Sequence, residues 1–175
     1  MPALKTARFS QQFLAAALKV QAAPRTEREA LVQQPSLVAY YLLGHAIELA
    51  LKSYLLVRGL SPNDLRRWAY GHKLDVLLAE CRRRRFGIAV KLTPPELKLI
   101  QHFSEIYAGK ELEYQFGGTR ALPQYADLVS LTERLSEGVF EYAKRKHKAN
   151  RSVNADVQGC LAASRAFSCV KNSKE

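Results

Sequence analysis

The segment from Ser36 to Arg58 is apolar around almost its whole circumference when it is drawn as a helix. Serine is a common N-cap residue, and the glycine at position 59 is a common helix terminator. A helix that is hydrophobic on nearly every side must be covered by neighbouring elements. We therefore expect the central helix of a bundle, with these residues in its core: Tyr40, Leu43, Ala46, Ile47, Ala50, Leu51, Tyr54 and Leu55.

Three ionisable residues, His45, Glu48 and Lys52, share one narrow stripe of this apolar helix. Glu48 and Lys52 have the spacing and order of a favourable helical ion pair. Buried ionisable groups must pair with one another or with a ligand. The stripe therefore predicts either a structural polar network or a phosphate or nucleotide site with Lys52 as the cation. No second carboxylate stands nearby, so we expect neither a metal nor a cofactor.

The rest of the chain also has helical spacing of its apolar residues. We expect a first amphipathic helix that ends before Pro24 and another helix over residues 72–85. Thr93 and Glu96 form a capping-box pattern with prolines between them, which predicts the start of a helix. The apolar side of that helix carries Leu97, Ile100, Phe103 and Tyr107. Pro123 then precedes a long amphipathic helix.

These segments predict an all-α fold, a four- to five-helix up-and-down bundle over residues 1–149. Residues 25–34 also have a short helical pattern. The aromatic loop over residues 109–122 could cover one end of the bundle or stack on a nucleobase. Residues 150–175 are rich in Ser, Ala, Asn and Lys and lack sustained apolar periodicity. For them we expect a basic, polar tail that is disordered or forms one weak helix.

The formal net charge is +11, and two short segments concentrate the cations. The arginine run comprises Arg82, Arg83, Arg84 and Arg85, and the lysine-rich segment comprises Lys144, Arg145, Lys146 and Lys148. Cations at a helix C-terminus complement the helix dipole. Four consecutive arginines exceed that need and point in several directions. They indicate either nucleic-acid phosphate binding or a merely solvated basic surface.

Other sequence features narrow the class of protein. The scattered residues Cys81, Cys160 and Cys169 fit neither a disulfide framework nor a zinc cluster. No apolar run reaches the roughly 18 residues of a membrane span, and the first residues lack the pattern of a secretion signal. We therefore expect a cytoplasmic protein with reduced thiols and no membrane contact. A glycine-rich phosphate loop and a serine nucleophile elbow are also missing.

Two motifs together resemble the HEPN domain superfamily. The first is GHAIELALK over residues 44–52, with a glycine at the end of its helix, and the second is YGHKL over residues 70–74. The resemblance is strongest over residues 36–85 and implies a bundle of four to five helices that is often dimeric. Some members are metal-independent ribonucleases of toxin and antiphage systems. Others are partners or substrates of minimal nucleotidyltransferases, and still others bind nucleotides or dimerise without catalysis.

The ribonuclease members carry an arginine followed four to six residues later by histidine, and this chain offers Arg67, or Arg66 one residue earlier, with His72. Histidine can exchange the proton of a 2′-hydroxyl, and arginine can stabilise the phosphate. Trp68 stands where those members usually have a small polar residue. In the alternative interpretation His72 caps its helix and bonds to Glu48. We expect a dimeric binding or partner module that contacts RNA or a nucleotide, in a toxin–antitoxin or antiphage setting, with a metal-independent ribonuclease as the alternative.

Overall fold

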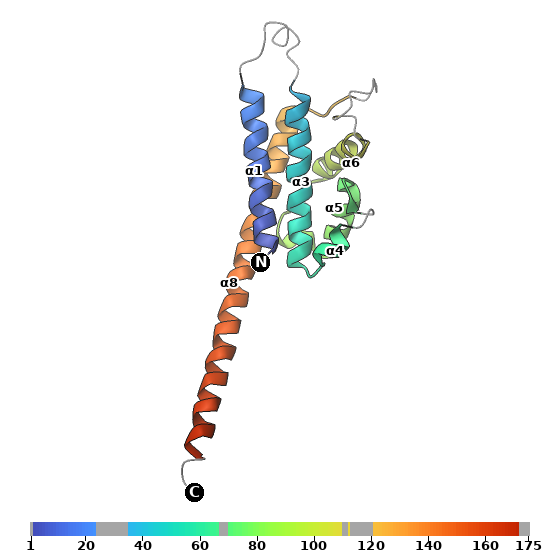
Figure 1. The fold of residues 1–175 in the computed structure, drawn as a ribbon. Coiled ribbons are helices and arrows are strands. Elements are labelled where there is room, and N and C mark those ends of the chain that lie inside the picture. The colour runs from blue at the N-terminus through green and yellow to red at the C-terminus, as the bar shows by residue number, and fades with distance from the viewer. Residues whose placement is uncertain (1, 24–34, 67–69, 110–111, 113–120, 172–175) are drawn as a thin grey trace. The chain divides into compact units, whose positions relative to one another are not determined.

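The computed structural model describes residues 2–23, 35–66, 70–109, 112 and 121–171, and for 153–171 it describes the backbone. Every regular element in these ranges is helical, so the prediction of an all-α bundle is confirmed (Figure 1). The helices are α1 (Pro2–Ala22), α3 (Leu37–Val57), α4 (Pro62–Leu65), α5 (Leu74–Arg83), α6 (Pro94–Ala108) and α8 (Tyr125–Lys171). A 3-10 turn spans Phe86–Ile88. The helix predicted over 25–34 and residues 113–120 of the aromatic loop lie outside the described ranges.

Helix α3 is the central helix, as its apolar circumference predicts. The eight apolar residues expected in the core are each at most 2% exposed. Helix α1 packs along one side of α3, and α5 and α6 pack along another (Figure 1). Ser10 on α1 donates a 2.7 Å hydrogen bond to the backbone carbonyl of Ala46 on α3. Since small residues line this contact on both helices, α1 and α3 approach each other closely.

The ends of α3 agree only in part with the sequence signals. Ser36 is the N-cap residue, but its hydroxyl makes no capping bond. Its backbone N–H instead donates to Oε1 of Gln21 at 3.0 Å, which joins the start of α3 to the end of α1. Gly59 has a φ of 92°, a left-handed conformation that glycine adopts without steric cost. The predicted glycine terminator is therefore confirmed.

Helix α6 begins with the predicted capping box. The backbone N–H of Thr93 donates to Oε2 of Glu96 at 2.7 Å, and the Thr93 hydroxyl donates to the same oxygen at 2.8 Å. Pro94 occupies the first turn, where a missing N–H costs nothing. These contacts fix where α6 starts, and with it the position of Tyr107 near its other end.

The chain divides into two compact units, Met1–Ala143 and Lys144–Glu175, with helical backbone as far as Lys171. Within the first unit, the start of α8 buries four apolar residues at helical spacing: Leu128, Leu131, Leu135 and Val139. The hydroxyls of Ser10 and Ser136 share a 2.7 Å hydrogen bond. None of the described helices is long and apolar enough to cross a membrane.

Candidate functional site

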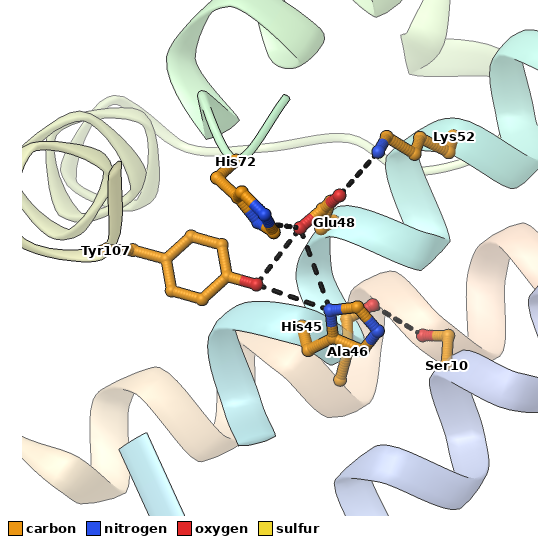
Figure 2. A network of polar contacts seen from close by, with 7 residues as sticks. All are labelled: Ser10, His45, Ala46, Glu48, Lys52, His72 and Tyr107. Atoms are coloured by element: carbon orange, nitrogen blue, oxygen red, sulfur yellow. Dashed lines mark hydrogen bonds and ion pairs between the residues drawn. The ribbon is translucent and has the colours of Figure 1, made fainter. Parts of the chain in front are cut away.

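Glu48 lies at the centre of a group of polar side chains that we call the polar junction: His45, Glu48, Lys52, His72 and Tyr107 (Figure 2). Three of these residues come from α3, one from the segment before α5 and one from α6. The Glu48 side chain is only 3% exposed. The junction therefore joins three parts of the bundle through one buried carboxylate.

Both carboxylate oxygens of Glu48 accept hydrogen bonds. Oε1 accepts one from Lys52 Nζ at 2.5 Å. Oε2 accepts one from the Tyr107 hydroxyl at 3.0 Å and lies 3.0 Å from Nδ1 of His72. Nδ1 of His45 lies 3.7 Å from the same oxygen and 3.3 Å from the Tyr107 hydroxyl. The predicted ion pair between Glu48 and Lys52 is present, and the expected bond between His72 and Glu48 is confirmed.

The surroundings of Glu48 stabilise its charged form. Burial alone raises the pKa of a carboxyl group. Here the close approach of His45, the hydrogen bond and positive charge of Lys52 and the nearby His72 outweigh burial and lower the pKa of Glu48 from 4.5 to about 2. Glu48 is therefore a carboxylate throughout the physiological range. It serves as an acceptor for its neighbours and not as a proton donor.

His72 occupies an unusual backbone conformation. Its φ is 51°, in the left-handed region that costs a non-glycine residue free energy. The residue capping α5 is Lys73, so the expectation that His72 caps its own helix is wrong. The imidazole lies edge-on to the Tyr107 ring, with centroids 5.6 Å apart, and its side chain is 47% exposed. Because Nδ1 faces Glu48, Nε2 is the ring nitrogen left to meet a ligand from solvent.

Tyr107 is the member of the junction that sequence reasoning missed, because its spacing only marks it as part of the apolar side of α6. A signal for it exists at Gly44. A β-carbon built on Gly44 would lie 2.5 Å from Cδ2 and 2.6 Å from Cε2 of Tyr107. A glycine in the middle of a central helix costs free energy unless something approaches its backbone closely. Here the Tyr107 ring makes that approach and carries its hydroxyl to Glu48.

Of the predicted ribonuclease pair, Arg67 and His72, the described residues include only His72. His72 belongs to the polar junction, whereas Arg67 lies outside the described residues. Arg66, the other arginine that precedes His72, is the exposed C-cap of α4. The histidine half of the pair thus has a defined orientation through Glu48.

The arginine run divides into two pairs with different surroundings. Glu80 accepts hydrogen bonds from Nε and Nη2 of Arg83 at 2.8 and 2.7 Å and from Nε of Arg84 at 2.5 Å. The hydrogen bonds from Arg83 and Arg84, together with the positive charges of both, lower the pKa of Glu80 from 4.5 to about 2. They outweigh burial, which alone would raise it. Arg84 also donates to the backbone carbonyl of Arg58 at 3.0 Å. Arg84 therefore fastens the ends of α3 and α5 together.

The other two arginines of the run, Arg82 and Arg85, are exposed. Arg85 has a φ of 64°, so the chain turns sharply where α5 has ended. No hydrogen bond of the described residues ties either guanidinium to Glu80. These two side chains are consequently the part of the arginine run that can meet an anion from solvent.

The lysine-rich segment lies in the second compact unit, on α8, and its four cations are exposed. Residues 144–152 include no Asp or Glu. At helical spacing, Lys144, His147, Lys148 and Arg151 share one face. A continuous basic stripe with no carboxylate in its sequence can follow a row of phosphates.

The described residues contain no group of three or more His, Cys, Asp and Glu side chains placed to hold a metal ion. Comparison of the chain with models of protein families, with curated proteins and with solved structures found no match in any of the three.

Proposed function

We propose that the chain is a HEPN-like helical module that binds nucleic acid through its exposed cations. The observation that carries this proposal is the row of exposed cations between Lys144 and Arg151 on α8. Arg82 and Arg85 add a second exposed pair at the end of α5. Neutralising phosphates releases counterions, which gives affinity without base specificity. RNA or DNA backbone is therefore the ligand class that fits these surfaces.

The test is the salt dependence of binding to a labelled single-stranded RNA, measured by fluorescence anisotropy. Replacing Lys144, Arg145, Lys146 and Lys148 by Gln should weaken binding and flatten the plot of log K against log salt by about 0.7 for each phosphate that the protein no longer neutralises. Arg82→Gln with Arg85→Gln should have a smaller effect of the same kind. Lys91→Gln with Lys98→Gln removes two exposed lysines elsewhere and is the matched control. Equally weakened binding in all three variants would contradict a defined binding surface.

A second candidate function, a metal-independent ribonuclease, is favoured by the contact between Glu48 and His72. A carboxylate on Nδ1 orients an imidazole and leaves its other nitrogen facing solvent. Nε2 of His72 could then take the proton of a 2′-hydroxyl while the 2′-oxygen attacks the adjacent phosphorus. The bond from phosphorus to the 5′-oxygen breaks, and the 5′-oxygen takes a proton from water, giving a 2′,3′-cyclic phosphate. The resemblance assigns Arg67 to the phosphate charge in this scheme.

The ribonuclease candidate is tested by incubating structured RNA with the purified protein in excess EDTA. Cleavage that disappears in His72→Ala and falls at least tenfold in Glu48→Gln would support it, because Glu48 orients the base. RNA that stays intact with the unaltered protein would leave the binding module as the function. His102→Ala is the control, since His102 bonds to the backbone of Ala121 away from the junction.

The resemblance also supplies the partners of this proposal: a second copy of the chain, and an antitoxin or a minimal nucleotidyltransferase. Light scattering after gel filtration gives the mass directly, and a homodimer would have twice the 19.7 kDa of one chain. A monomer at all accessible concentrations would remove the dimer from the proposal.

A further inference from the structure

Helix α1 has two apolar stripes, of which the core uses only one. Its buried stripe consists of small residues: Ala3, Ala7, Ser10 and Ala17. The second stripe has Phe9, Phe13, Ala16 and Val20, at spacings of four, three and four residues. Phe9 is 53% exposed, and the other three are partly exposed. Large apolar side chains thus face solvent along the length of α1.

Helix α3 continues this surface on the side next to α1. Residues 38, 42, 45, 49, 52 and 56 alternate spacings of four and three, which is the heptad pattern of helix-to-helix contacts. Val38 is 57% exposed, and Leu42, Leu49 and Leu56 are partly exposed. The rings of Phe13 and His45 meet edge to face with centroids 4.3 Å apart, which joins the two stripes. We call the joined surface the α1–α3 face: Phe9, Phe13, Ala16, Val20, Val38, Leu42, Leu49 and Leu56.

The exposed charges on the two helices of the α1–α3 face have one sign. Helix α1 carries the exposed cations Lys5, Arg8 and Lys19 on one flank of its outer stripe and has no Asp or Glu. The single carboxylate of α3 belongs to Glu48, which is buried and bonded to Lys52. An occupant of this face therefore finds apolar side chains bordered by cations and no exposed carboxylate on either helix.

We propose that the α1–α3 face is the docking surface for an amphipathic helix of a partner protein, with a heptad apolar stripe flanked by Asp and Glu. An amphipathic helix binds by laying its heptad-spaced apolar residues against an apolar surface of this kind. Acidic flanks pair with Lys5, Arg8 and Lys19, which speeds association and selects the partner. A second copy would bring the same cations against this face with no carboxylate to meet them. This inference does not depend on nucleic-acid binding.

The test uses two labelled helical peptides of about three heptads, both with Leu at the two apolar heptad positions. One has Glu at the flanking positions and the other has Lys there. We expect the acidic peptide to bind saturably at physiological salt, at least tenfold tighter than the basic one. Phe9→Glu and Leu49→Glu should each weaken that binding more than tenfold. Ile88→Glu, at an exposed apolar residue outside the face, should leave it unchanged. Circular dichroism checks that the variants fold.

Charge reversal provides the second arm. Replacing Lys5, Arg8 and Lys19 together by Glu should reverse the preference between the two peptides, because the apolar contacts remain and only the flanking charges change. Binding of neither peptide, or equal binding of both, overturns the proposal. It is also overturned if the protein is a dimer that Phe9→Glu converts to a monomer, since the face would then belong to a second copy.

Discussion

The ring of Tyr107 lies against the backbone of Gly44, so close that a β-carbon at position 44 would approach Cδ2 of the ring to 2.5 Å. The hydroxyl of the same tyrosine donates a hydrogen bond to the carboxylate of Glu48, one turn further along α3. The missing side chain of Gly44 therefore leaves room for the ring whose hydroxyl bonds to Glu48. This relationship yields a test in which a normally favourable substitution becomes harmful.

Gly44→Ala should destabilise the protein although alanine is the better helix former. In an open helix this change gains about 1 kcal/mol. Here the added methyl group collides with the Tyr107 ring, and overpacking of this kind costs about 1–3 kcal/mol. Urea unfolding followed by circular dichroism measures the difference. Gly87→Ala is the control, because a β-carbon there meets nothing within 4 Å. A Gly44→Ala protein as stable as the original would show that the ring moves aside freely.

Glu48→Gln should lower the free energy of unfolding by about 1–3 kcal/mol, because it leaves the donors around a buried group poorly paired. Lys52→Met removes one of these donors and keeps a similar side-chain volume. The two changes in one chain should cost less than the sum of their separate costs, since both disturb the same ion pair. Strict additivity in this double-mutant cycle would contradict the network.

Acid should destabilise the protein partly through Glu48. Its pKa is 4.5 unfolded and about 2 folded, so the unfolded chain binds this proton first as the pH falls. The stabilisation is complete above about pH 4.5 and is lost as the pH falls toward 2. Glu48→Gln should therefore flatten the dependence of stability on pH in this window. Glu80→Gln should flatten the curve in the same window, because the pKa of Glu80 is likewise lowered from 4.5 to about 2. A Glu48→Gln curve parallel to the original would show that the pKa of Glu48 is not depressed.

His72→Asn should be tolerated better than His72→Ala. Both variants lack the imidazole that bonds to Glu48, but asparagine adopts a positive φ more readily than alanine. We expect the asparagine variant to be more stable by about 0.5–1 kcal/mol in urea unfolding. The same two substitutions at His102, which sits within α6, should show the opposite order because alanine favours helix. Equal stabilities at position 72 would mean that the loop relaxes to negative φ.

The arginine run should separate stability from binding. Arg84→Gln removes bonds to Glu80 and to the Arg58 carbonyl, and we expect the free energy of unfolding to fall by about 1 kcal/mol. Arg82→Gln should leave stability within about 0.5 kcal/mol and should weaken RNA binding instead. Thermal unfolding and anisotropy on the same preparations measure both effects. A similar loss of stability in both variants would contradict the division of the run into two pairs.

Sequence reasoning left the bond between Glu48 and His72 as one of two alternatives for His72. Sequence periodicity was sufficient for the helical class, the central position of α3 and the ion pair between Glu48 and Lys52. It works there because apolar spacing and ionisable residues on a buried face leave few alternatives. It failed where geometry depends on close packing. Tyr107 has the spacing of an ordinary core residue, and only the glycine at position 44 hints that a ring lies across it. The left-handed backbone of His72 could not be predicted from the sequence, since glycine and asparagine are the residues that indicate a positive φ.

The bonds of Glu48 also have a consequence for the order of folding. Its partners His72 and Tyr107 stand 24 and 59 residues away in the chain. The carboxylate can meet both only after α5 and α6 have docked on α3, which places the polar junction late on the route to the native state. Mutations in the polar junction should then increase the unfolding rate much more than they decrease the refolding rate. The polar junction around Glu48 would thus slow the rate at which the folded protein unfolds.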